Sequence, residues 1–202
     1  MDALKPNSIA LVRRLLDLNK PYFTLADLEK VLGQARPSLY VTLNRLVGQG
    51  VLTRLRRGAY QSAFRPSALA RVANTLVYPS YLSFESALSQ HGMLSQTPYM
   101  LTFATSRRTR RLRLGVVEVQ FHQLKAELFF GYTMADGVYL AEPEKALLDQ
   151  AYLAARGVSS LAWDELDLSS LDAARLRDYA RRFPSPVERT ALVAMGIAHT
   201  VV

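Results

Sequence analysis

The stretch from residue 34 to residue 61 constrains the fold of this chain more than any other. Pro37 suits the first turn of a helix, because that turn needs no amide donor. Apolar side chains then recur at three- and four-residue spacing, as on the buried face of a helix: Leu39, Leu43, Leu46 and Val47. A glycine stop and a ribbon rich in arginine follow. This order is typical of a winged helix-turn-helix, in which one helix enters the major groove of DNA and a β-hairpin lies along the backbone.

The opposite face of this predicted helix carries side chains that suit a DNA groove. Helical periodicity of about 100° per residue places these residues there: Ser38, Val41, Asn44 and Arg45, with Tyr40 on one flank and Arg36 at the helix start. Asparagine can pair with adenine and arginine with guanine, while serine, arginine and tyrosine can reach phosphates. An ordinary solvated face is the alternative, and the helix alone does not exclude it.

The arginine-rich ribbon favours the DNA interpretation. Arg54, Arg56 and Arg57 lie within four residues, and Gly58 supplies a turn before residues 59–61 return as a second strand. We expect the three arginines to hold phosphates in or beside the minor groove. Three apolar residues are expected to hold the ribbon to the core: Leu52, Leu55 and Tyr60. No aromatic stacking motif for RNA accompanies them.

Two further helices are predicted before residue 34. Ser8 can cap the first, and Asn19–Pro21 closes it. Thr24 is a predicted N-cap of the second, because Asp27 three residues later suits a capping box. Gly33 stands at the expected stop. Residues 1–62 are therefore predicted to form a winged helix-turn-helix DNA-binding domain.

The distribution of charge supports a phosphate-bearing partner for this domain. The formal net charge of the 202-residue chain is +8. Residues 1–62 contain ten Lys or Arg against four Asp or Glu, a net of +6, whereas residues 63–202 contain fifteen against thirteen, a net of +2. A basic excess concentrated in one module is typical of a protein that binds DNA.

Several function classes are excluded or disfavoured by composition. The chain has no cysteine, which excludes disulfides, thiol nucleophiles and cysteine-based metal sites. Its three histidines, His91, His122 and His199, are too far apart for metal-ligand spacing, so no metal and no cofactor is expected. No apolar run approaches the roughly 18 residues of a membrane span, and the N-terminus lacks a secretory pattern. We therefore expect no membrane partner and a cytoplasmic location.

A short polar junction, residues 62–66, leads to a second predicted domain at residues 67–202. Helical spacing covers residues 67–76 and 84–91, with Ser83 as a cap and Gly92 as a stop. Strands are predicted over 99–105, 116–121, 128–132 and 138–140, and helices over 143–156, 171–183 and 186–196. The prediction is an α+β fold, with a small, mostly antiparallel sheet and C-terminal helices.

Two charged segments of the second domain require interpretation. The densest basic run is a set of five arginines: Arg107, Arg108, Arg110, Arg111 and Arg113. It fits either a solvated hairpin arm or a second contact with phosphates or with an acidic protein. The segment Glu142-Pro143-Glu144-Lys145 suggests catalysis at first, but a proline at the first helical position followed by acids is simply good helix initiation. No phosphate loop or nucleophile elbow is present, and no catalytic residue is predicted.

The chain resembles the AbiEi-type antitoxins, the regulator half of type IV toxin–antitoxin systems that act in abortive infection and phage defence. The resemblance covers about residues 8–155. It rests on these segments: Arg57–Tyr60, Tyr78–Leu88, His91-Gly92, Gln96–Pro98, Thr102–Thr105, the arginine run, and Ala141–Asp149. The most specific are Tyr-Leu-Ser-Phe-Glu-Ser-Ala-Leu and Ala-Glu-Pro-Glu-Lys-Ala-Leu-Leu-Asp.

The resemblance implies a repressor that binds double-stranded DNA at inverted repeats upstream of its own operon. It also implies a C-terminal domain that counteracts a nucleotidyltransferase-like toxin, with or without a direct complex. Two other hypotheses remain. One is a stand-alone transcriptional regulator whose C-terminal domain senses a small molecule, and the other is an enzyme that processes nucleic acid.

Overall fold

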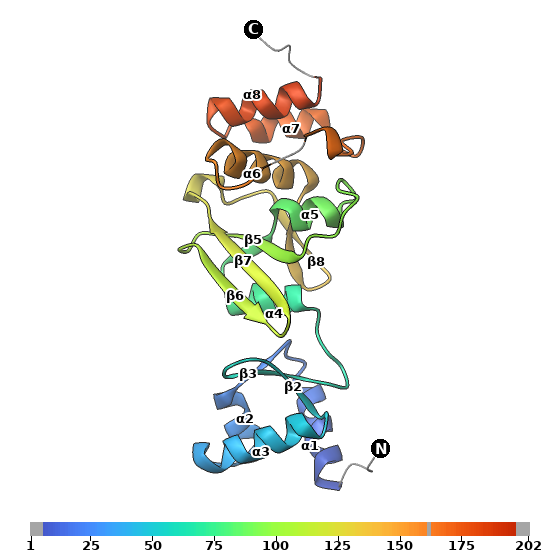
Figure 1. Cartoon of the computed structure of the whole chain (residues 1–202), viewed down its shortest axis with the longest axis vertical. Helices are drawn as coiled ribbons and strands as arrows, with labels where there is room; N and C mark the ends of the chain where they lie inside the picture. The colour runs from blue at the N-terminus through green and yellow to red at the C-terminus, as the bar shows by residue number, and fades with distance from the viewer. Residues whose placement is uncertain (1–5, 161–162, 197–202) are drawn as a thin grey trace. The chain divides into compact units, whose positions relative to one another are not determined.

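The computed structural model describes residues 6–160 and 163–196 (Figure 1). It contains two compact units. The N-terminal unit runs up to Thr75 and includes Arg113–Val116, and the C-terminal unit comprises Leu76–Leu112 and the chain from Val117 onwards. None of the helices among the described residues is long and apolar enough to span a membrane.

The N-terminal unit has the predicted order of three helices and a wing. Its elements are α1 Pro6–Asp17, β1 Phe23–Thr24, α2 Leu25–Leu32, α3 Arg36–Gly48, β2 Leu52–Arg56, β3 Ala59–Ser62 and α4 Leu69–Leu76. The strands form an antiparallel sheet in the order β1-β3-β2, so the hairpin has a third strand that the sequence pattern did not predict. With two residues, β1 is too short to leave an alternating pattern.

The boundaries of these helices follow from local chemistry. The Thr24 hydroxyl accepts a hydrogen bond from the amide of Asp27, and the Asp27 carboxylate accepts one from the amide of Thr24, which completes the predicted capping box. Gly33 ends α2 with a φ of +64°, which glycine adopts at little cost. Pro37 lies in the first turn of α3 as predicted. The prediction for α1 was wrong in one detail, because the helix begins at Pro6, two residues before Ser8.

The core of the N-terminal unit is apolar. The predicted stripe of α3 is buried at three of its four positions, and Val47 is partly buried. The buried cluster consists of Leu11, Leu15, Phe23, Leu28, Leu39, Leu43, Leu46, Val51, Leu52 and Tyr60. Leu52 and Tyr60 belong to the hairpin, so burial of their side chains anchors the ribbon to the helices, as predicted.

The C-terminal unit is built on a six-stranded sheet in the order β6-β7-β5-β4-β9-β8. The strands are β4 Ser80–Leu82, β5 Met100–Thr105, β6 Arg110–Leu114, β7 Val117–Gln123, β8 Tyr132–Ala135 and β9 Val138–Ala141. β4 is antiparallel to β5 and β8 is antiparallel to β9, whereas β5 runs parallel to β7 and β4 parallel to β9. The α+β class is confirmed. The sheet, expected to be mostly antiparallel, is mixed, because the β4–β9 and β5–β7 pairings are parallel.

Helices cover this sheet. They are α5 Phe84–Gln90, α6 Pro143–Ala155, α7 Ala173–Ala180 and α8 Ser185–Ala194, with 3₁₀ turns at Ala126–Leu128 and Trp163–Glu165. Figure 1 shows α6, α7 and α8 stacked together on the far side of α5 from β6 and β7. Residues Glu144–Leu153 of α6 are all buried, which makes α6 the central helix of the unit.

Three strand assignments in this unit differ from the prediction, and one of them is β4, which was not predicted. The segment 128–132, predicted as a strand, is the end of a 3₁₀ turn and a loop that leads into β8. Its apolar run reflects aromatic packing, because the rings of Phe129 and Tyr81 lie 5.0 Å apart and those of Phe130 and Tyr179 lie 5.1 Å apart. β6 was not predicted as a strand because its arginines conceal the alternation of Leu112 and Leu114.

Candidate nucleic-acid interface

The outer face of α3 presents every side chain that the sequence predicted for a DNA groove. Val41 is 71% exposed and Tyr40 is 46% exposed, although both are large apolar or aromatic residues. The polar members of the predicted set are exposed as well: Arg36, Ser38, Asn44 and Arg45. The face opposite the leucine stripe of α3 is therefore open to a partner.

These side chains differ in whether they already have a partner. The Arg36 guanidinium forms an ion pair with Glu29 at 3.0 Å, and the Ser38 hydroxyl donates to the carbonyl of Ala35 at 2.9 Å. In the part of the chain that the structure describes, no hydrogen bond or ion pair holds the side chain of Asn44 or Arg45. The full hydrogen-bonding capacity of Asn44 and Arg45 thus remains for a ligand, as does that of the Tyr40 hydroxyl.

The β2–β3 hairpin exposes its arginines because of a β-bulge. The register shifts between Arg54 and Arg56, so that Arg54 lies opposite Tyr60 and Arg56 opposite Ala59. Strict alternation from buried Leu52 would turn Arg54 inward, but the bulge resets the pattern and buries Leu55 instead. As a result both Arg54 and Arg56 lie on the outside.

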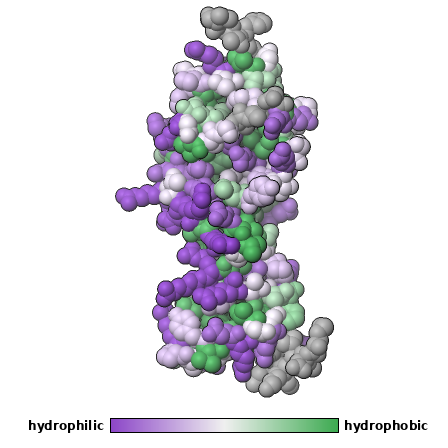
Figure 2. Space-filling view, in the orientation of Figure 1, coloured by the Kyte–Doolittle hydropathy of each residue, from purple (hydrophilic) through white to green (hydrophobic). Residues whose placement is uncertain are grey.

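The turn of the hairpin adds a third arginine. Arg57 and Gly58 connect the two strands, and Gly58 has a φ of +77°, a conformation that favours glycine. Arg54, Arg56 and Arg57 make no hydrogen bond or ion pair with any described residue. Figure 2 shows hydrophilic side chains gathered over the part of this unit that carries β2 and β3. The ribbon is therefore a set of unpaired cations on a short, anchored support.

The second arginine cluster lies on and before β6, at one edge of the six-stranded sheet. All five arginines are exposed. Arg111 is partly neutralised, since it donates to the side chain of Gln120 at 3.0 Å and lies 3.5 Å from Glu118. The other four, Arg107, Arg108, Arg110 and Arg113, have no ion pair among the described residues. Charged residues on an edge strand also prevent pairing with other sheets, so this cluster has a structural explanation as well.

A different kind of polar site lies inside the C-terminal unit, where the two most specific sequence motifs meet. Lys145 forms an ion pair with Asp149 one turn later on α6, and both side chains have no exposed surface. The Lys145 ammonium also donates to the Tyr81 hydroxyl at 2.8 Å. Asp149 accepts hydrogen bonds from Tyr81 at 2.9 Å and from Ser83 at 2.8 Å. The Tyr-Leu-Ser motif and the Lys-Ala-Leu-Leu-Asp motif therefore form one buried network.

Aromatic rings surround the Lys145 ammonium, and burial shifts the pKa values of the groups in this network. The Lys145 ammonium lies between 5.1 and 5.3 Å from the ring centres of Tyr81, Phe130 and Phe183. Burial lowers the pKa of Lys145 and raises the pKa of Asp149, and the attraction between the two groups opposes both shifts. Burial also raises the pKa of Tyr81 well above its usual value.

The neighbouring residues continue the network along the sheet. The amide of Ser86 donates to the Thr102 hydroxyl, which itself donates to the carbonyl of Ser83 at 2.8 Å. This arrangement holds Phe84 at a φ of +57°, a strained conformation for a bulky residue. The ring of His91 donates to the carbonyl of Ala141 at 2.8 Å, so this histidine has a structural role.

The carboxylates near Pro143 have structural partners too. Glu142 accepts a hydrogen bond from the Tyr179 hydroxyl at 2.5 Å. Glu144, which is 1% exposed, accepts one from the amide of Asp172 at 2.8 Å and lies 3.7 Å from Arg175. Glu142 thus connects the start of α6 to α7. Glu144 connects α6 to Asp172, the N-cap residue of α7. The described residues contain no group of three or more acids or histidines that could hold a metal ion.

Comparison with known proteins agrees with the geometry of the N-terminal unit. Residues 11–63 match a family model, AbiEi_4, described as a transcriptional regulator and AbiEi antitoxin. Over these residues the N-terminal region is similar to that family. The matched segment runs from within α1 to just past β3 and so contains all nine predicted DNA-contact residues. The description of the family names transcriptional regulators and antitoxins.

The whole chain shares its fold with a solved protein. It is similar to the crystal structure of the RV2827C protein from Mycobacterium tuberculosis, with a TM-score of 0.62. The match covers 100% of this chain and 85% of that one at 17% sequence identity, so it speaks to the fold alone. None of the curated proteins matches the sequence.

Sequence reasoning missed the buried network of the C-terminal unit. Lys145 was interpreted as part of a helix start, and Asp149 was not singled out by its chemistry. Their four-residue spacing is equally typical of an exposed ion pair. The one signal that could have identified them was the apolar context, because Ala146, Leu147 and Leu148 separate the two charges on a helix that is buried on all sides.

Proposed function

We propose that the N-terminal domain binds double-stranded DNA and represses the operon that encodes it, at inverted repeats upstream. The observation that carries this proposal is the combination of an open α3 face with three unpaired arginines on the bulged hairpin. A groove-binding helix beside a basic wing is the arrangement of a winged helix-turn-helix. The description of the matched family as transcriptional regulators supports it.

In this proposal the residues of α3 have distinct roles. Asn44 and Arg45 contact base edges, since neither has an intramolecular partner to give up. Val41, which is 71% exposed, makes an apolar contact such as one with a thymine methyl group. Ser38, Arg36 and Tyr40 hold the backbone near the start of the helix.

The wing supplies affinity rather than sequence preference. Arg54, Arg56 and Arg57 hold phosphates in or beside the minor groove, each releasing a counterion on binding. The arginines Arg107, Arg108, Arg110, Arg111 and Arg113 are a second candidate contact for phosphates or for an acidic protein. As a regulator of its own operon, the protein is proposed to act in the cytoplasm.

The C-terminal unit is proposed to counteract a nucleotidyltransferase-like toxin, without catalysis of its own. The description of the family as AbiEi antitoxins supports this part, although the matched segment ends at residue 63. The test is co-expression of the neighbouring toxin gene with the whole chain and with residues 63–202 alone. Rescue of growth by either supports the antitoxin role, and rescue by neither contradicts it.

The DNA-binding proposal is tested by titrating upstream DNA in a gel-shift assay. Arg45→Ala is expected to cost about 1–3 kcal/mol at the native site and to relax sequence preference. Arg56→Ala should weaken binding to all sequences alike and reduce the salt slope by about one. Arg189→Ala, which removes an exposed arginine of the C-terminal unit, is the matched control. If both test variants bound like the wild type, the proposed interface would be wrong.

A regulator that senses a small molecule is the second candidate, and one observation favours it. The described residues of the C-terminal unit form cavities that include one of about 390 Å³ and one of about 370 Å³, within the usual size range of small-molecule sites. In that case DNA affinity would change with a ligand and would not depend on a toxin gene.

A further inference from the structure

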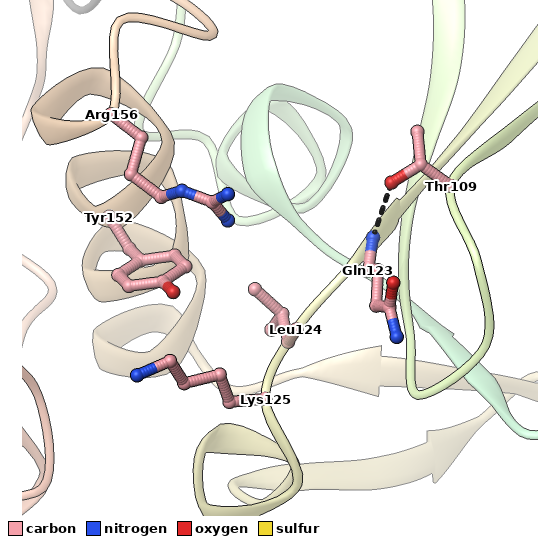
Figure 3. A pocket seen from close by; sticks show the side chains of 6 residues that line it. All are labelled: Thr109, Gln123, Leu124, Lys125, Tyr152 and Arg156. Carbon is pink, nitrogen blue, oxygen red and sulfur yellow. Dashed lines mark hydrogen bonds between the residues drawn. The ribbon is translucent and has the colours of Figure 1, made fainter.

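Residues of the C-terminal unit alone line a cavity of about 390 Å³. Figure 3 shows that three segments line it: α6 through Tyr152 and Arg156, the end of β7 and the residues after it, and the loop before β6. The remaining lining residues are Thr109, Gln123, Leu124 and Lys125. The lining contains two cations and no carboxylate.

Arg156 is the main charged group of this pocket. Figure 3 shows its guanidinium extending from the end of α6 toward the β7 side of the cavity. The guanidinium stacks on the Tyr152 ring, with its central carbon 5.4 Å from the ring centre. No hydrogen bond or ion pair with a described residue uses its five N–H donors. The stack fixes the plane of the guanidinium and leaves its donors for an oxyanion.

The other polar groups of the pocket have hydrogen atoms to donate. Lys125 lies 3.8 Å from Glu127, but both side chains are 65% exposed, so this ion pair is weak and is readily exchanged for a ligand. The Thr109 hydroxyl accepts the amide hydrogen of Gln123 at 3.0 Å, which leaves its own hydrogen to donate. The Tyr152 hydroxyl has no hydrogen-bond partner among the described residues.

This chemistry matches a phosphate group. A phosphate dianion offers several acceptor oxygens and about two negative charges, and arginine binds it through parallel N–H bonds. Two cations from different segments balance that charge. Arg107, Arg108 and Arg110 stand beside Thr109 in the chain and raise the local concentration of anions. The volume exceeds that of one phosphate, which leaves room for the rest of a small phosphorylated molecule.

We propose that this pocket binds a small phosphorylated ligand, with Arg156 and Lys125 as the phosphate-binding residues and Thr109 and Tyr152 as further donors. The phosphate-binding residues Arg156 and Lys125 are not among the proposed DNA contacts, although Thr109 lies between arginines of the 107–113 cluster. Failure of one proposal therefore leaves the other in place.

The experiment is calorimetric titration of the full chain with inorganic pyrophosphate at constant ionic strength. We expect saturable binding at one site, reduced at least tenfold by Arg156→Gln and several-fold by Lys125→Gln. Arg189→Gln removes another exposed arginine of the same unit that has no hydrogen bond or ion pair with a described residue, and it should leave the affinity unchanged. Absence of saturable binding in the wild type, or equal losses in the Arg156 and Arg189 variants, would overturn the proposal.

Two further measurements separate this pocket from its alternatives. Lys125 is exposed, so Lys125→Gln tests the site even if Arg156→Gln does not fold. Titration with a short DNA duplex distinguishes the source of the phosphate. Unchanged duplex affinity in the Arg156 variant, together with lost pyrophosphate binding, supports the small-ligand site. Weakened duplex binding without any pyrophosphate binding would assign the pocket to the DNA backbone and overturn the proposal.

Discussion

The two units of this protein differ in whether they bury charged side chains. In the N-terminal unit the charged residues among those described lie on the surface, and the core cluster is apolar. In the C-terminal unit Glu144, Lys145 and Asp149 are at most 1% exposed. An exposed, unpaired charge can meet a partner at little cost, whereas a buried charge must have its partner inside the molecule. Exposed charges suit the binding of a partner molecule. The buried charges fix how α6 packs against the six-stranded sheet.

The difference also predicts how each unit responds to mutation. A buried ion pair adds little stability compared with apolar packing, but removal of one member leaves a charge without compensation. An ion pair at the surface is screened by water and contributes little in either case. The Lys145–Asp149 pair and the Arg36–Glu29 pair are examples of these two limits within one chain.

The largest expected effect is at the buried pair. Asp149→Asn keeps an oxygen that can accept from Tyr81 and Ser83 but removes the charge opposite Lys145. Lys145→Met removes the ammonium from its aromatic cage while filling a similar volume. Each single change should lower the free energy of unfolding by about 3–5 kcal/mol. The double variant should cost less than the sum of the two, by roughly 2 kcal/mol.

Urea unfolding followed by Trp163 fluorescence measures this cycle. Trp163 is the single tryptophan of the chain and lies in the C-terminal unit, so its signal reports that unit. If the free energy of unfolding of the single variants lay within about 1 kcal/mol of the wild-type value, the buried charges would be dispensable for stability. Charge removal would then cost as little in the C-terminal unit as is expected in the N-terminal unit, and the proposed difference between the units would be wrong.

Sequence reasoning located the surface charges of the N-terminal unit well, because the rules that it uses describe half-exposed elements. The leucine spacing of α3, the Thr24–Asp27 capping box and the Gly58 turn each leave a local pattern in the sequence. A one-residue bulge leaves no such pattern. The outward direction of Arg54 could be guessed from its charge, but the bulge that produces it could not.

The same reasoning failed in the C-terminal unit for a physical reason. A charged residue is assumed to face water, and four-residue spacing of Lys145 and Asp149 fits that assumption. Their actual surroundings come from Tyr81, Ser83 and Phe183, which lie 34 or more positions away in the chain. Long-range contacts of this kind leave no periodic pattern. Resemblance to the AbiEi-type proteins identified the two motifs, and only the structure explains why they occur together.

An intermediate effect is expected at the cap that joins the wing to the helices. Thr24 pairs with Ala59 of β3 and caps α2, so it belongs to both elements. Thr24→Ala removes the acceptor for the Asp27 amide and should cost about 1 kcal/mol of unfolding free energy. Thr24→Ser keeps the hydroxyl and is the control. Equal stability of the two variants, measured by circular dichroism in urea, would contradict the capping role.

The pH dependence of this cap has a defined sign. Burial acts to raise the pKa of Asp27, but hydrogen bonds from Lys20 and Thr24 outweigh it and lower that pKa below its ordinary value. The ionised carboxylate is therefore favoured in the folded state. Its contribution is complete above the unfolded pKa of about 4 and is lost as the pH falls through the lowered value.

Tyr179 provides a smaller, alkaline counterpart in the C-terminal unit. Its hydrogen bond to Glu142 raises the pKa of the hydroxyl to about 12, so the protonated form is favoured in the fold. Tyr179→Phe keeps the edge-to-face contact with Phe130 and should cost about 1 kcal/mol at pH 8. The stabilisation by this hydrogen bond is lost as the pH rises from about 10 to about 12. The unfolding free energies of the wild type and of Tyr179→Phe should therefore converge over that pH range. A difference that stayed constant to pH 12 would exclude this bond as its source.

The smallest stability effect is expected at the exposed Arg36–Glu29 pair of the N-terminal unit. Here both stability and DNA affinity can be measured for the same substitution. Glu29→Gln removes the charge opposite Arg36 and should change the unfolding free energy by less than about 0.5 kcal/mol. If Arg36 contacts DNA phosphates as proposed, the same change frees its guanidinium and removes a repulsive charge. DNA affinity at low salt should then rise a few-fold, and the gain should disappear in the Glu29→Gln/Arg36→Ala double variant. A substantial loss of stability without a gain in DNA affinity would mean that this pair serves the fold, as the buried pair of the C-terminal unit does.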